Sequence, residues 1–270
     1  MSPTTELRFA ANLHWLFTEL PFMQRFDAAA AAGFRAVEYP APYGFSADEL
    51  RRRLDDAGLD QVLINSPTGA PDSPTRYGSA CIPELVKEFR EGFDRALEYA
   101  GALGSRLIHV VGGICPDDVD RSHAFAQYVA NIAWAAERSA GSGVHLVLET
   151  INQRDAPGFV LESQEQAAGV VQAVGRDNVG LLFDVYHCQV GQGDVTRTLH
   201  ELLPFVSHIQ VADPPSRTEP GTGELGWDFV FDRIRSFDYP GWIGCEYRPA
   251  HETVEGLRWR DRYCGQGDAS

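Results

Sequence analysis

Two short runs decide the fold: HLVLE at His145–Glu149 and VGLLFD at Val179–Asp184. Each run is almost wholly apolar and ends in one carboxylate. A helical pattern at Ser163–Val174 separates them, and Gly175 then predicts the end of that helix. Strands of a parallel sheet are covered on both faces and are therefore apolar throughout, so this stretch predicts a strand–helix–strand unit of a parallel α/β fold.

The same alternation extends in both directions along the chain. Eight strands are predicted, at Leu7–Leu13, Ala36–Glu38, Gln61–Asn65, Arg106–Val110, His145–Glu149, Val179–Asp184, Val206–Gln210 and Trp242–Glu246. Helical patterns follow them, at Met23–Ala32, Ala47–Ala57, Pro83–Leu103, Ser122–Ala140, Ser163–Val174, Val195–Leu202, Phe229–Ser236 and Thr253–Arg260. Ser46 before the second helix, with Glu49 three residues later, forms a capping box.

Eight such units in 270 residues give about 34 residues per unit, which is typical of a (β/α)8 TIM barrel. The expected fold is α/β, a single TIM-barrel domain over residues 1–270. An open doubly wound sheet is the alternative. That fold usually has a glycine turn after its first strand, but here the first strand leads into Asn12-Leu13-His14-Trp15.

Composition excludes several classes of protein. The net charge is −15, which disfavours nucleic acid and anionic membranes as partners. No apolar stretch approaches the roughly 18 residues of a membrane span, and the first residues lack a signal-peptide pattern. The cysteines number five, with no CxxC pair, so we expect free thiols and a cytoplasmic location. The sequence leaves a homo-oligomer open.

Polar side chains end the last four predicted strands, at Glu149, Asp184, Gln210 and Glu246. Their spacings of 35, 26 and 36 residues correspond to one unit each, so all four should meet at the carboxyl end of the barrel. Three carboxylates and an amide oxygen would repel one another without a cation, and hard oxygen ligands suit Mg²⁺ or Mn²⁺. The alternative for each residue is a helix cap or an ion pair with an arginine.

Other polar residues lie near the same end. His187 follows Asp184 by three residues, where a substrate contact is favoured over a purely structural role. Glu38, Asn65 and His109 end strands two to four, and rim packing or function fits each equally. The segments Ser66–Ile82 and Asp213–Gly226 are long enough to be lids. Within the second, Gly221–Gly226 matches GxGxxG, but no strand–helix–strand unit follows it, which argues against a dinucleotide site.

Longer motifs then point to a family. LVLETINQRDAPGFVL, LLFDVYH, HIQVADPPSRTEPGTGE and GWIGCEYRP resemble the hydroxypyruvate isomerase family of xylose-isomerase-like barrels, and the resemblance covers nearly the whole chain. It implies a divalent metal held by Glu149, Asp184, Gln210 and Glu246, with the two glutamates as the catalytic proton-transfer pair. It also implies that His187 and Arg217 contact the substrate. The sequence departs from the family after strand three, where Asn65-Ser66-Pro67 replaces the usual Asn-Leu-Pro, which leaves substrate identity open.

The expected reaction moves a carbonyl along a small hydroxy or oxo acid. A proton leaves the carbon beside the carbonyl, an enediolate forms, and a second group returns a proton to the neighbouring carbon. We expect interconversion of hydroxypyruvate and 2-hydroxy-3-oxopropanoate. The candidates for offsetting the substrate's charge are the metal, Arg217, and His14 or His187; Asn65 and His109 are further candidates for contact. The alternatives are an isomerase or 3-epimerase of a larger keto acid (2-oxo-tetronate type) or ketose, a metal-dependent DNA-repair endonuclease, and a non-catalytic sugar-acid binder.

Overall fold

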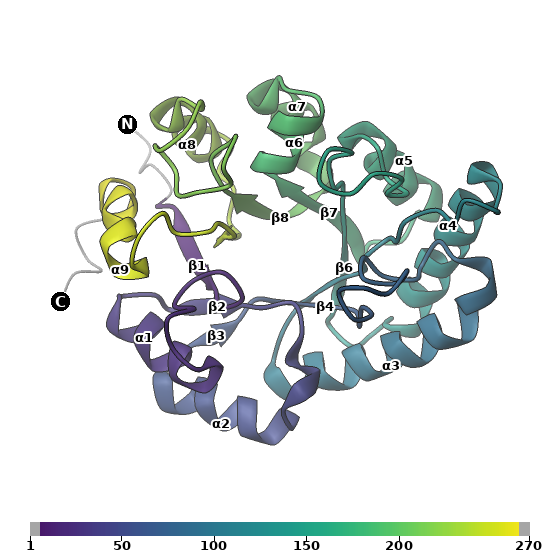
Figure 1. Cartoon of the computed structure of the whole chain (residues 1–270), viewed down its shortest axis with the longest axis horizontal. Helices are drawn as coiled ribbons and strands as arrows, with labels where there is room; N and C mark the ends of the chain where they lie inside the picture. Colours follow the sequence, from purple (N-terminus) through teal and green to yellow (C-terminus); the bar gives the residue numbers. More distant parts are fainter. Residues whose placement is uncertain (1–5, 265–270) are drawn as a thin grey trace.

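The computed structural model describes residues 6–264, so the ends of the expected domain, 1–5 and 265–270, lie outside the described residues. Parallel strands form a nearly closed barrel, and helices surround it as an outer ring (Figure 1). The strands are β1 Arg8–Asn12, β2 Ala36–Glu38, β3 Asp60–Gln61, β4 Leu63–Asn65, β5 Leu107–His109, β6 His145–Glu149, β7 Val179–Asp184, β8 Val206–Val211 and β9 Trp242–Cys245. The expectation of a TIM barrel is confirmed.

The third predicted strand differs from expectation because it is divided in two. Its first part, β3, pairs with β2, and its second part, β4, pairs with β5. Val62 lies between them and donates its N–H to the carbonyl of Val37 at 2.9 Å. The sheet order β3-β2-β1-β9-β8-β7-β6-β5-β4 therefore begins and ends in one continuous segment, which brings the two edges of the sheet together.

The helices lie close to the predicted segments. They are α1 Arg25–Ala31, α2 Ala47–Ala57, α3 Val86–Leu103, α4 Arg121–Arg138, α5 Gln164–Val174, α6 Val185–Gly191, α7 Val195–Leu202, α8 Trp227–Ser236 and α9 Thr253–Gly256. The Ser46 hydroxyl accepts the N–H of Glu49 at 3.3 Å, and Gly58 ends α2 with a φ of 65°. The helix α6 was not predicted from the sequence. This one short helix begins directly after β7, and Asp184 caps it by accepting the backbone N–H groups of Tyr186 and His187.

Two hydrophobic clusters fill the molecule. The larger lies between strands and helices, and the smaller, inside the barrel, includes Ala10, Ala36, Val147 and Leu182. Side chains alternate along a strand, so the residue two positions after each of these shares its side of the sheet. Those positions hold Asn12, Glu38, Glu149 and Asp184. The barrel interior is therefore apolar at one level and polar at the next, toward the carboxyl ends of the strands.

The last helical segment completes the outer ring. Arg260, in the 3-10 turn Leu257–Arg262 after α9, donates to the carbonyl of Ala32 at 2.6 Å and stacks over Phe34. This contact joins the C-terminal segment to the first helical unit. Within residues 6–264, no helix is both long and apolar enough to cross a membrane.

Candidate active site

Strand register places the predicted ligands at one end of the barrel. Asp184 of β7 lies opposite Gln210 of β8, and Gln210 lies opposite Gly244 of β9, two residues before Glu246. Glu149 ends β6, the neighbour of β7. Glu149, Asp184 and Gln210 are at most 6% exposed, so their polar atoms are removed from bulk solvent.

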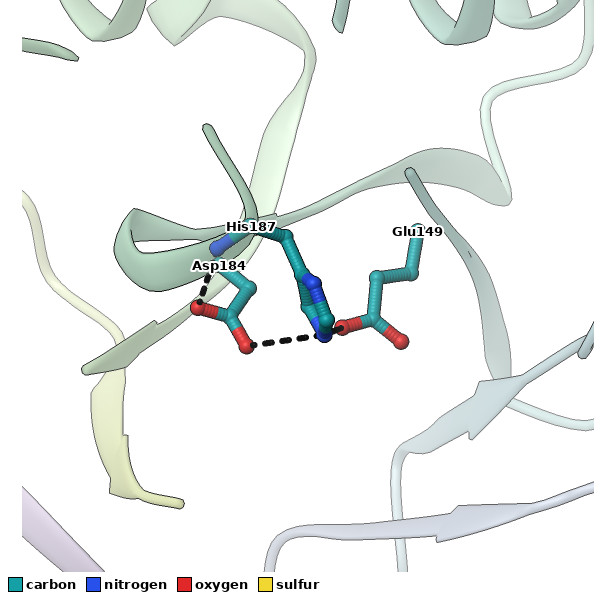
Figure 2. A group of neighbouring side chains, drawn as sticks. All are labelled: Glu149, Asp184 and His187. Atoms are coloured by element: carbon teal, nitrogen blue, oxygen red, sulfur yellow. Dashed lines mark hydrogen bonds and ion pairs between the residues drawn. The ribbon is translucent and has the colours of Figure 1, made fainter. Parts of the chain in front are cut away.

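Glu149, Asp184 and His187 form a compact group that could hold a metal ion, with one ligand atom from each lying within 4.8 Å of the others. Figure 2 shows the His187 side chain, carried by α6, extending between the two carboxylates. His187 Nε2 is 3.9 Å from Glu149 Oε1 and 3.8 Å from Asp184 Oδ2. Both distances exceed that of a hydrogen bond, so His187 Nε2 is not hydrogen-bonded to either carboxylate.

Glu246 and Arg217 form the second part of the site. Arg217 Nη2 is 3.1 Å from Glu246 Oε1 and 3.5 Å from Asp184 Oδ2. The guanidinium lies against the rings of Trp15 and Tyr186, 5.0 and 4.9 Å from their centroids. Trp15 also donates its indole N–H to Glu246 Oε1 at 3.2 Å. The arginine is held in one orientation beside the carboxylates while its Nε has no partner among the described residues.

A buried network centred on Glu38 adjoins this group. Glu38 Oε1 accepts from Asn12 Nδ2 at 3.0 Å and from Gln210 Nε2 at 2.7 Å, and Glu38 Oε2 is 2.7 Å from His208 Nε2. Gly244 provides the space, because a Cβ at that position would collide with the Glu38 carboxylate. Glu38 thus holds the nitrogen side of the Gln210 amide.

Burial and mutual repulsion raise the pKa values of the carboxyl groups in the site. Burial, followed by the charges of Glu246 and Asp184, raises the pKa of Glu149 well above its ordinary value. Burial also raises the pKa of Glu246 and of Asp184, although Arg217 opposes both shifts. The pKa of Arg217 is raised because these carboxylates outweigh the effect of its own burial. The carboxylates of the site therefore carry more negative charge than Arg217 alone neutralises.

These residues fit a divalent cation by the chemistry of their donors. Asp184 Oδ2 and Gln210 Oε1 are buried, and neither has a hydrogen-bond partner among the described residues. Asp184 Oδ2 has the ion-pair contact of Arg217 at 3.5 Å, whereas a fully unpartnered buried oxygen such as Gln210 Oε1 costs about 1–3 kcal/mol unless something binds it. Because Glu38 holds the Gln210 nitrogen, the amide has only its oxygen to offer. A set of carboxylate and amide oxygens suits Mg²⁺ or Mn²⁺.

The remaining predicted contact residues are arranged differently. His109 lies beside the site, with Nδ1 3.5 Å from Glu149 Oε2. Burial lowers the pKa of His109 to about 3, so the ring is neutral. His14 is exposed and lies with Arg25 and Tyr39 around a separate cavity of about 100 Å³. Asn65 is half-buried. Among the described residues, neither the His14 nor the Asn65 side chain forms a hydrogen bond or ion pair with the carboxylates.

The loop after β8 explains the GxGxxG pattern. The buried Asp213 carboxylate accepts the backbone N–H groups of Gly221, Gly223 and Leu225 at 2.9, 2.8 and 3.2 Å. A Cβ on Gly223 would collide with this carboxylate. The glycines therefore allow the loop to wrap around an internal aspartate, and the same loop carries Arg217, whose φ is 56°.

Comparison with known proteins now identifies the family. The model of the family described as xylose isomerase-like TIM barrel matches residues 26–263. The chain belongs to this family. It is 45% identical to a 2-oxo-tetronate isomerase of Cupriavidus necator over 96% of this chain and 99% of the relative. It is 41% identical to a hydroxypyruvate isomerase of Escherichia coli over 95% and 99%.

A solved structure is also similar, with 41% identity and a TM-score of 0.92 over 96% of this chain and 99% of the other. Its description is AP endonuclease, family 2, from Brucella melitensis. Both named isomerases match this chain over nearly the whole length of each protein. On that basis this xylose isomerase-like chain is an isomerase.

Several site residues of this family member were absent from the sequence-based candidates. Trp15, Tyr186 and Asn152 lie in loops or in the undetected α6, where strand patterns give no signal. His208 precedes Gln210 by two positions on β8, and this alternation could have identified it as facing the same interior.

Proposed function

We propose that this protein is a keto-acid isomerase that interconverts hydroxypyruvate and 2-hydroxy-3-oxopropanoate by proton transfer through an enediolate. The observation that supports this most is the pair of glutamates around Arg217, the buried Glu149 and the 19% exposed Glu246, in a chain 41% identical to a hydroxypyruvate isomerase. A second candidate substrate is 2-oxo-tetronate, favoured by the relative at 45% identity. We place the protein in the cytoplasm, as its free cysteines favour.

The charged end of the substrate needs a cation to hold it. Hydroxypyruvate carries a carboxylate, and Arg217 is a cation of the site with an unpartnered Nε–H. The rings of Trp15 and Tyr186 both pack against its guanidinium. Arginine pairs with carboxylates through parallel N–H groups, so Arg217 would orient the substrate with its reacting carbons toward the glutamates.

Proton transfer then needs a base and an acid on carbon. In hydroxypyruvate the proton leaves C3 and returns to C2, so the product is an isomer and no electron acceptor is required. Burial raises the pKa of both glutamates, which makes an ionised one a stronger base toward the C3 proton and lets a protonated one serve as the acid toward C2. We assign one transfer to each glutamate.

A divalent ion, which Glu149, Asp184, Gln210 and Glu246 would hold, supplies Lewis-acid stabilisation of the negative charge that develops on the substrate oxygens. The protein supports this by excluding water, since Glu149, Asp184 and Gln210 are at most 6% exposed. The apolar level beneath them closes the barrel below the site.

The test is an isomerisation assay with hydroxypyruvate, 2-oxo-tetronate and a free ketose, each with and without EDTA. We expect turnover of an oxo acid that EDTA abolishes and Mg²⁺ or Mn²⁺ restores. Glu246→Gln should lower kcat by about 10²–10⁴-fold, because loss of an acid–base group acts on the chemical step. Glu98→Gln, at an exposed glutamate, is the matched control. Robust turnover of the ketose alone would contradict the proposed substrate class.

A further inference from the structure

Asn152 contacts His187 beneath the site. Asn152 Nδ2 is 2.7 Å from His187 Nδ1, and the backbone N–H of Asn152 also donates to that nitrogen at 3.3 Å. Both residues are buried, at 2% and 3% exposure. The backbone N–H and the side-chain amide of Asn152 thus contact the same ring nitrogen, His187 Nδ1.

The orientation of the Asn152 amide is fixed by its other contacts. Its Oδ1 accepts the backbone N–H of Asp155 at 3.0 Å, and its Nδ2 donates to Asp155 Oδ2 at 3.1 Å. A reversed amide would set oxygen against the Asp155 carboxylate and nitrogen against an N–H. The group facing His187 Nδ1 is therefore an N–H donor.

Further contacts hold Asp155 in place. The Tyr186 hydroxyl donates to Asp155 Oδ2 at 2.8 Å, and Arg154 donates to the Tyr186 oxygen at 3.0 Å. The segment after β6 and the helix α6 are thereby joined by hydrogen bonds that end at His187. Because each donor in this series of hydrogen bonds has a defined acceptor, His187 Nδ1 can only be an acceptor.

We propose that Asn152 is a positioning residue that holds His187 as the neutral tautomer protonated on Nε2. A nitrogen that accepts two N–H groups carries no proton, so the proton of the neutral ring lies on Nε2. Nε2 faces the space between Glu149 and Asp184 without reaching either. His187 then presents a hydrogen-bond donor to a substrate oxygen and has no lone pair there for a metal ion.

This inference rests on the proposed function for the identity of the substrate. It distinguishes two possible roles of His187, substrate contact and metal ligand, which the distances alone do not distinguish. Glu149, Asp184 and His187 have the spacing of a three-residue metal site. The Nε2–H tautomer removes His187 from that set and leaves oxygen ligands only. The remaining ligands would then be other oxygen donors, of which Gln210 Oε1 is buried and has no hydrogen-bond partner among the described residues.

The tautomer can be observed directly by long-range ¹H–¹⁵N NMR on protein labelled at histidine, free of metal and with Mg²⁺. His187 is one of eight histidines, and its signals are assigned by their loss in His187→Gln. We expect a bare Nδ1 and a protonated Nε2 in both states. A protonated Nδ1 in the wild-type protein would overturn the proposal, whether or not the protein turns over any keto acid.

Two substitutions extend the test. Asn152→Asp replaces the donor with an acceptor, so the proton should move to Nδ1. Asn152→Ala removes the amide donor and leaves only the backbone contact at 3.3 Å, so part of the His187 population should move to the Nδ1-protonated tautomer, and a spectrum identical to the wild type would contradict the role of the amide. An unchanged tautomer in a folded Asn152→Asp variant would contradict the assigned role. If that variant does not fold, the wild-type and Asn152→Ala spectra still decide the outcome.

Discussion

Glu38 is a buried carboxylate that contributes to the site by orienting its hydrogen-bond partners. It has no exposed surface, and it contacts Asn12 of β1 and both His208 and Gln210 of β8. Outer partners of ligands orient the donor atoms and tune their affinity. Glu38 therefore links the packing of the barrel interior to the direction of the Gln210 oxygen.

Glu38→Gln should weaken Mn²⁺ binding by about 10–100-fold, as is typical when an orienting partner is lost. The new amide would turn a donor toward Asn12 or Gln210, so the free energy of unfolding should also fall by about 1–3 kcal/mol. Mn²⁺ titration and denaturant unfolding measure the two effects, with Glu98→Gln as the control. Mn²⁺ affinity equal to the wild type would show that Glu38 does not orient a ligand.

Among individual residues, the sequence predicted those that lie at the carboxyl ends of strands. Glu149, Asp184 and Gln210 were predicted from the apolar runs that they end, and the structure places them at the same end of the barrel. Trp15 and Asn152 were not predicted, because their positions depend on how loops return to the barrel. The Asn152–His187 contact, for instance, joins residues 35 positions apart.

The loop after β8 is an element whose shape depends on one side chain. Asp213 gathers three backbone N–H groups from the far part of the loop, and its own backbone pairs with Thr218 on either side of Arg217. Arg217 is therefore presented to the site by a loop that an internal carboxylate organises.

Asp213→Asn should disturb this loop, because an amide group would set a donor against backbone donors. We expect a loss of about 1–3 kcal/mol in unfolding free energy and a raised KM for the oxo acid, since Arg217 loses its fixed position. Steady-state kinetics and thermal unfolding measure these effects. Asp232→Asn, at an aspartate 67% exposed on α8, is the matched control and should change neither quantity.

Elements with strong local signals were predicted closely. The bounds of α2 and α7 match the predicted segments, and the capping box and Gly58 explain why α2 begins and ends where it does. The sequence analysis missed α6 because it has seven residues and starts inside a strand-end motif. The division between β3 and β4 was also missed, since it arises from closure of the barrel and not from a local breaker.

The charge of the whole molecule bears on the DNA-repair alternative. A similar solved structure is described as an AP endonuclease, but this chain has a net charge of −15. A phosphate backbone would be repelled by that field. We therefore expect no nicking of duplex DNA containing an abasic site, with Mg²⁺, Mn²⁺ or Zn²⁺, in a gel assay at low salt. Metal-dependent nicking that Asp184→Asn abolishes would contradict this expectation.

The most direct test of the whole account is a calorimetric titration of Mn²⁺ into the metal-free protein, for the wild type and for Asp184→Asn. The oxygen ligands at the carboxyl end of the barrel predict one site per chain in the wild type and its loss in the variant. Because a bound ion stabilises the folded state, a hundredfold excess over Kd should add about 2.7 kcal/mol to the wild type's stability. Absence of binding, or equal binding in both proteins, would contradict the account.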